Sequence, residues 1–136
     1  MVVRSQERGQ KVLDEIIAKT ANHSVSLMTC DMSSMASIRS FAAEFKKKYR
    51  YLNVLINNAG AEFAKRQVTS EGFEQTFAVN YLAPFLLTYE LLDLLKASAP
   101  SRIINVSSGL AKNGKVDFDD LQNERNYKGM QAYSNA

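Results

Sequence analysis

The stretch Leu52-Asn53-Val54-Leu55-Ile56-Asn57-Asn58-Ala59-Gly60 decides the fold. Its first five residues are mostly apolar, which predicts a short strand from Leu52 to Ile56. Asparagines and a glycine follow at once, and residues of these types favour turns. The strand is therefore expected to end at Asn57-Asn58-Ala59-Gly60.

Upstream of this strand, the sequence alternates between strand and helix patterns. Residues 2–3 are the stub of one strand, and Val25 to Cys30 forms another. Ser5 can cap a first helix, and Ser33 or Ser34 can cap a second one. The apolar faces of these two helices are formed by Val12, Leu13, Ile16 and Ile17, and by Ile38, Phe41, Ala42, Phe45 and Tyr49.

Downstream of this strand, aromatic side chains recur every four residues, which predicts one long helix. These side chains belong to Phe73, Phe77, Tyr81, Phe85 and Tyr89. Arg102 to Val106 is the next predicted strand, and the remainder is rich in loops. The alternation of strands and helices along the chain predicts an α/β fold, in which helices cover a parallel sheet.

Pro84 interrupts the long helix. Proline has no backbone N–H, so the carbonyl four residues earlier, that of Asn80, loses its helical partner. A simple kink is one interpretation. The alternative is that the helix opens at Asn80 so that its carbonyl can hold a water or a ligand, and both interpretations stay open at this stage.

Composition limits the classes of function. The chain has 136 residues and a net charge of +3 at pH 7, which fits one soluble globular domain. The basic run Lys46-Lys47-Lys48 with Arg50 falls at a predicted helix end, where cations complement the helix dipole, and no basic stripe favours a nucleic-acid partner. The single cysteine, Cys30, is expected to pack at a buried strand end in a reducing compartment. One histidine, His23, without a cysteine cluster predicts no metal site.

The most apolar stretch runs from Phe85 to Leu95 and is interrupted by Thr88, Glu90 and Asp93. We therefore expect no membrane-spanning segment in this chain and a cytoplasmic location. An anchor upstream of Met1 in a longer protein stays open as an alternative.

Three motifs follow one another in a fixed order. They are Asn57-Asn58-Ala59-Gly60 after a strand, Val79-Asn80 in the long helix, and Ile104-Asn105-Val106-Ser107-Ser108 at a strand end, with Tyr133 downstream. Together they resemble the short-chain dehydrogenase/reductase family over essentially the whole chain. The segment from Gly109 to Ala132 resembles the retinol-dehydrogenase-like branch. The resemblance implies a Rossmann-like, doubly wound parallel sheet, and reversible hydride transfer between NADP(H) and a hydrophobic alcohol, aldehyde or ketone.

The resemblance also implies catalytic roles. Tyr133 matches the tyrosine that exchanges a proton with the carbonyl or alcohol. Ser108 matches the serine that hydrogen-bonds the reacting oxygen, with Ser107 as the alternative. Asn80 matches the asparagine whose main-chain carbonyl holds a water of the proton relay, in agreement with the opening expected before Pro84.

Cofactor contacts follow from the same resemblance. Asp31 and Met32 match the pair that flanks the adenine, and Asn58, Ala59 and Gly60 match the turn that approaches the cofactor ribose. Arg4 follows the strand at which related enzymes choose between cofactors. An arginine there can pair with a 2′-phosphate, which favours NADP(H) over NAD(H), although a surface arginine at a helix start is an equal alternative.

Two parts of the family pattern lie outside the sequence. No Gly-x-x-x-Gly-x-Gly turn opens a helix, and such a turn holds the pyrophosphate through its backbone amides. Tyr133-Ser134-Asn135-Ala136 stops one position before the lysine of Tyr-x-x-x-Lys. We therefore expect residues 1–136 to be a partial NAD(P)-binding domain, an incomplete sheet without strand 1 and the C-terminal strands.

The resulting hypothesis is a fragment of an NADP(H)-dependent oxidoreductase that is inactive by itself. Its partners would be a small hydrophobic substrate, no nucleic acid, and in the longer protein a second copy of itself. Two alternatives stay open. The chain is a non-catalytic piece that docks on a full-length relative, or it is an incomplete gene product without a function.

Overall fold

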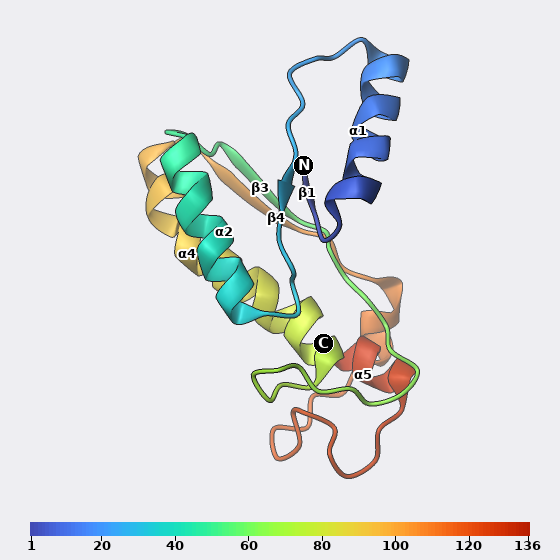
Figure 1. The fold of residues 1–136 in the computed structure, drawn as a ribbon. Coiled ribbons are helices and arrows are strands. Elements are labelled where there is room, and N and C mark those ends of the chain that lie inside the picture. Colours follow the sequence, from blue (N-terminus) through green and yellow to red (C-terminus); the bar gives the residue numbers. More distant parts are fainter. The chain divides into compact units, whose positions relative to one another are not determined.

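The computed structural model describes all residues, Met1–Ala136, as two compact units, Met1–Asp31 and Met32–Ala136. Figure 1 traces the chain through both units. Each unit contains one pair of parallel strands, and the two pairs form separate sheets. The expected alternation of helices and parallel strands is therefore present, without a strand that joins the two pairs.

The first unit consists of β1 (Val2–Val3), α1 (Gln6–Thr20) and β2 (Met28–Thr29). Ser5 caps α1 as predicted, because its side chain accepts a hydrogen bond from the backbone of Arg8. The predicted strand from Val25 to Cys30 is wrong in length. β1 offers only a short partner, so the ladder is limited to Met28 and Thr29, and one further bond joins Cys30 N to the carbonyl of Val3.

The second unit contains the remaining elements. They are α2 (Met35–Lys48), β3 (Val54–Asn57), α3 (Gln75–Phe77), a π-helical turn η1 (Ala78–Leu82), α4 (Ala83–Ala97), β4 (Arg102–Asn105), a 3-10 helix η2 (Gly109–Asn113) and α5 (Gly129–Asn135). β3 and β4 pair in parallel, with Ile56 opposite Ile104. Their bounds differ from the predicted strands by one or two residues.

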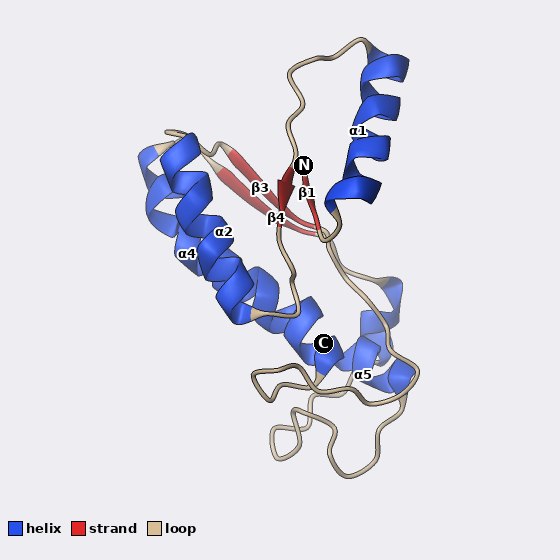
Figure 2. Ribbon diagram, in the orientation of Figure 1, coloured by secondary structure: helices blue, strands red, loops and turns tan.

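The core of the second unit lies between α2 and α4, which pack against each other (Figure 2). Ser34 caps α2, and Ile38, Phe41 and Ala42 are buried on its predicted apolar face. The buried side chains of α4 are Ala83, Leu86, Leu87, Leu91 and Leu95. Their spacing of three or four residues forms one stripe, and burial of this stripe stabilises the pair of helices.

The predicted long helix is present with one correction. It begins at Gln75, because Phe73 lies in a tight hairpin in which its backbone bonds Thr69. The aromatic residues Tyr81, Phe85 and Tyr89 lie on an exposed face instead of the buried stripe.

By length and composition, the continuous helical stretch Gln75–Ala97 could cross a membrane. Core helices pass the same test, and 33% of the tested window of this stretch is buried.

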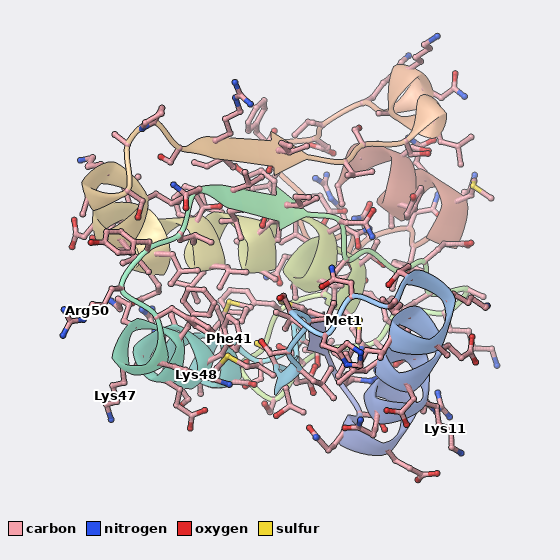
Figure 3. The ribbon with its side chains drawn as sticks, turned by 90° about the horizontal axis from the view of Figure 1, so that it is seen from above. Met1, Lys11, Phe41, Lys47, Lys48 and Arg50 are labelled. Carbon is pink, nitrogen blue, oxygen red and sulfur yellow. The ribbon has the colours of Figure 1, made fainter.

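The basic run occupies the end of α2, as expected. Lys47 and Arg50 point away from the ribbon in Figure 3. Lys48 Nζ lies 5.3 Å from the centre of the Tyr49 ring. Lys46 Nζ donates to the carbonyl of Glu90 on α4 at 3.0 Å. The cations therefore interact with the helix end, an aromatic ring and a neighbouring helix.

One face of the β3–β4 sheet is open. Four apolar side chains of the two strands point away from α4. They are Val54 (45% exposed), Ile56 (58%), Ile104 (43%) and Val106 (55%). Contiguous exposed apolar patches favour association with other chains. We therefore expect residues 1–136 to self-associate through this face.

Replacing Ile56 and Ile104 together by threonine should reduce this self-association. Threonine keeps the β-branched shape that strands favour and lowers the apolar area. We expect less light scattering at equal concentration. The matched control is Ile38→Thr, which changes a fully buried residue and should increase aggregation through unfolding. Equal scattering by the double variant and the unchanged chain would contradict the assignment of this face.

Candidate active site

A cavity of about 360 Å3 lies in the second unit, at the carboxyl end of the β3–β4 sheet. It brings together all three predicted catalytic residues, Tyr133, Ser108 and Asn80. It also contains three of the six predicted cofactor contacts, Asn58, Ala59 and Gly60. These residues come from four separate segments, and parallel strands bring two of the segments to the same edge.

Asn80 holds the wall of this cavity. Its side-chain Oδ1 accepts from Ala61 N at 2.8 Å, and its Nδ2 donates to the Ala61 carbonyl at 3.0 Å. These two bonds fix the loop that continues from Asn58-Ala59-Gly60. The side chain of Asn80 therefore supports the loop at this site. The sequence analysis had considered only its main-chain carbonyl, as the group that holds a water.

The helix departs from α-helical geometry at Asn80, in agreement with the opened helix, one of the two interpretations of Pro84. Asn80 lies in the π-helical turn η1, and Ala83 N bonds the carbonyl of Ala78, five residues earlier. Pro84 follows in the first turn of α4. Pro84 has no N–H that could donate to the carbonyl of Asn80, four residues earlier. The wider π-helical turn accommodates this missing hydrogen bond. Turns of this kind are frequent at functional sites.

Ser108 begins η2 and is partly buried. Its Oγ accepts a hydrogen bond from Leu110 N at 3.2 Å. A hydroxyl that accepts one bond still has its own hydrogen to donate. Ser107 lines the same cavity and is exposed, so the structure keeps both serines within reach of the site.

Tyr133 lies on the short helix α5, which two contacts hold against the turn after η2. Lys115 N donates to Asn135 Oδ1 at 2.9 Å. Gly114 packs so closely on the carbonyl of Ser134 that a Cβ at this position would overlap that oxygen. Sequence reasoning missed Gly114 and Asn135, because neither stands in a motif, although a lone glycine in a loop can indicate a close backbone approach.

The other predicted cofactor residues lie outside this cavity. Arg4 and Asp31 belong to the first unit, where they follow the paired strands β1 and β2 at the same edge of that small sheet. Arg4 is exposed, and Asp31 is partly buried. Met32 opens the second unit, ahead of α2.

Carboxylates order the loop between η2 and α5. Asp120 accepts from the backbone of Glu124 and of Arg125 at 2.8 and 3.2 Å, and Arg125 also pairs with Asp117. The hydrogen bond from Glu124, with smaller contributions from Arg125, lowers the pKa of Asp120 below its ordinary value. These acidic residues thus serve turns and ion pairs within the loop, and no group of three or more potential metal ligands forms in the chain.

Two further cavities border the site. One, of about 250 Å3, lies between Phe77, Tyr81, Phe118 and Leu121 and excludes Tyr133 and Ser108. The other, of about 630 Å3, runs along Phe85, Tyr89 and Ile103 beside α4. Both are mainly apolar, whereas polar and apolar atoms contribute almost equally to the lining of the cavity around Tyr133.

Paired parallel strands with helices between them place the chain in the class of Rossmann-like α/β proteins. A family model described as short chain dehydrogenase matches residues 1–119. The chain belongs to this family, which consists of oxidoreductases that use nicotinamide nucleotides.

Among curated relatives, the chain is 44% identical over 133 residues to retinol dehydrogenase 11 of Homo sapiens. The alignment covers 98% of this chain and 42% of that protein. The chain is also 40% identical over 134 residues to the human polyprenol dehydrogenase, covering 96% and 41% of the two chains. The chain thus spans less than half the length of these relatives, and its similarity confirms the expected retinol-dehydrogenase-like branch.

Solved structures confirm the fold. A protein from Mycobacterium paratuberculosis has a TM-score of 0.80 and 30% identity, and the match covers 98% of this chain and 46% of that one. An NADPH-bound carbonyl reductase from chicken fatty liver has a TM-score of 0.65 and 26% identity, with 98% and 56% covered. The predicted incomplete Rossmann-like sheet is confirmed, since each match leaves about half of the larger fold beyond these residues.

Proposed function

We propose that residues 1–136 carry the proton-transfer group and part of the nucleotide site of an NADP(H)-dependent oxidoreductase. Its substrates are hydrophobic alcohols, aldehydes or ketones. The observation that supports this proposal is the convergence of Tyr133, Ser108 and Asn80 on one cavity. The relatives support the substrate class, because retinol and polyprenol dehydrogenases are named for apolar alcohols.

In this proposal Tyr133 donates its hydroxyl proton to the carbonyl oxygen during reduction and takes it back during oxidation. Ser108 donates the hydrogen that its bond from Leu110 leaves available, and this stabilises charge on the reacting oxygen. The main-chain carbonyl of Asn80 holds a water that returns the proton to Tyr133. A nicotinamide bound in this cavity would supply or accept the hydride.

The residues present fit part of a dinucleotide. The backbone of Asn58, Ala59 and Gly60 lines the cavity beside Tyr133, as needed for a ribose next to the reacting ring. Arg4 and Asp31 lie at the carboxyl ends of paired parallel strands, the edge at which such folds bind nucleotides. We assign Asp31 with Met32 to the adenine and Arg4 to a 2′-phosphate.

A chimaera tests the proposal. Residues 1–136 would replace the matched segment of human retinol dehydrogenase 11, so that the rest of the fold is supplied by a relative. We expect NADP(H)-dependent interconversion of retinol and its aldehyde. A folded chimaera that binds NADPH without any turnover would contradict the assignment of the catalytic residues in this chain.

Arg4→Ala in the chimaera should weaken NADPH binding by about 10- to 100-fold and leave NADH binding nearly unchanged. Only NADPH carries the 2′-phosphate, and a charge-assisted hydrogen bond contributes about 1.5–3 kcal/mol. Calorimetric titration with both cofactors measures the difference. Arg8→Ala, which removes another exposed arginine of the same unit, is the matched control. Equal loss of both cofactors would overturn the preference for NADP(H).

A further inference from the structure

A buried polar cluster lies at the start of the long helix, outside the predicted catalytic residues. Glu74 and Thr76 are fully buried. The Glu74 carboxylate accepts from Thr76 N and from Phe77 N, each at 2.8 Å. A carboxylate at a helix N-terminus satisfies the free N–H groups and complements the helix dipole. Burial and these hydrogen bonds therefore hold the cluster in place in the second unit.

Tyr127 joins this polar cluster to two other segments. Its hydroxyl donates to the carbonyl of Phe63 at 2.6 Å and lies 3.1 Å from Thr76 Oγ1. Because the tyrosine hydrogen is used on Phe63, the threonine must be the donor to the tyrosine oxygen. Burial raises the pKa of Tyr127 above its ordinary value of 10.0, so the hydroxyl keeps its hydrogen at neutral pH.

The same contacts define where α5 begins. Tyr127 lies two residues before Gly129, the first residue of α5. A Cβ on Gly129 would come within 2.6 Å of the Phe63 carbonyl, so the helix starts directly against the segment that Tyr127 bonds. Tyr133 follows four residues later, about 6 Å along the helix axis. The anchor is thus close to the proposed proton donor.

The anchored segment continues from a turn that lines the cavity, since Asn58, Ala59 and Gly60 are lining residues and Phe63 follows three residues later. Phe63 is two residues beyond Ala61, whose backbone is held by both side-chain atoms of Asn80. One short segment therefore aligns Asn80 on one side and the start of α5 on the other. A displacement at Phe63 or Tyr127 would change the distance between the groups that line the cavity.

We propose that Tyr127 is a positioning residue, which sets Tyr133 against Ser108 through its bridge between Thr76 and Phe63. The inference rests on the proposed oxidoreductase function and adds a residue that touches neither substrate nor cofactor. Its effect is confined to geometry, and reaction rates depend steeply on geometry, since a displacement of about 1 Å can lower a rate by about 100-fold.

The test uses the chimaera with Tyr127→Phe, Thr76→Val and Thr76→Ser. Tyr127→Phe keeps the ring and removes the bridging hydroxyl, and Thr76→Val removes its partner. We expect kcat to fall about tenfold in both variants, with KM for retinol and for NADP+ within about twofold. Thr76→Ser keeps the hydroxyl and should retain the unchanged kcat. Tyr51→Phe, at a tyrosine that is 69% exposed, is the matched control.

A purely structural role would lower the folded, cofactor-binding fraction and leave kcat per bound cofactor unchanged, and that result would overturn the proposal. An unchanged kcat in Tyr127→Phe would do the same. A crystal structure of Tyr127→Phe gives a second readout that needs no turnover. We expect a longer distance between Tyr133 Oη and Ser108 Oγ, and an unchanged distance refutes the positioning role. Failure of the proposed function is recognised separately, because the unchanged chimaera would then bind NADPH without turnover, or Tyr133→Phe would be as active as the unchanged chimaera.

Discussion

Tyr133→Phe in the chimaera should lower turnover by about 100- to 10,000-fold, the range that a positioned general acid or base contributes. The substitution removes one hydroxyl from a partly buried side chain on α5 and keeps its ring. No hydrogen bond that holds α5 depends on this hydroxyl, since the helix is fixed by Asn135 and by the packing of Gly114. The fold and NADPH affinity should therefore be retained.

Steady-state kinetics and a cofactor titration of the same preparation separate the two effects. Tyr51→Phe serves again as the control, because it makes the same chemical change at an exposed site. If Tyr133→Phe kept most of its turnover, the tyrosine would not be the proton donor. If it lost NADPH binding in proportion to turnover, the residue would belong to the cofactor site instead.

Gly114→Ala should have the second largest effect, with a loss of about 1–3 kcal/mol of stability and about 100-fold of turnover. The backbone at Gly114, with φ −68° and ψ 140°, suits any residue. The conflict is purely steric, because the new Cβ would overlap the Ser134 carbonyl. That carbonyl is backbone of α5, so relief of the overlap must move the helix that carries Tyr133.

Gly109→Ala is the matched control, since a Cβ there meets no atom within 4 Å. Thermal unfolding and kcat of the two variants should be compared in the same chimaera. We expect Gly109→Ala to match the unchanged protein in both. A stable and fully active Gly114→Ala variant would show that α5 can shift without a loss of catalytic geometry.

Local features of the fold were readable in the sequence. The cap at Ser5 was predicted, and Ser34 was one of the two candidates for the second cap, because a serine side chain satisfies free N–H groups only a few residues away. A disturbance of the helix near Asn80, as a kink or an opening, was predicted because the missing N–H of Pro84 acts within one turn, and the structure has a π-helical turn there. The buried face of α2 followed from its helical spacing of apolar residues.

Features that depend on contacts with another segment of the chain were predicted less well. The strand expected from Val25 to Cys30 shrank to two residues, since a strand extends only as far as its neighbour offers hydrogen bonds. The aromatic repeat suggested a helix from Phe73, but a hairpin with Thr69 includes that residue. Periodicity also could not show that Phe85 and Tyr89 are exposed, because burial depends on which elements pack nearby.

The sequence by itself determined the family motifs, the order of helices and strands, and the identity of Tyr133, Ser108 and Asn80 as candidates. Helices and caps follow from residue types and local spacing, because hydrogen bonds within a turn and helical periodicity act over a few positions. The three candidates follow from the resemblance of the motifs to the family. Only the tertiary structure decided that these three residues line one cavity and that Tyr127, 51 residues from Thr76, joins it through a hydroxyl pair. Contacts across such a separation depend on the path of the whole chain, which no local pattern contains.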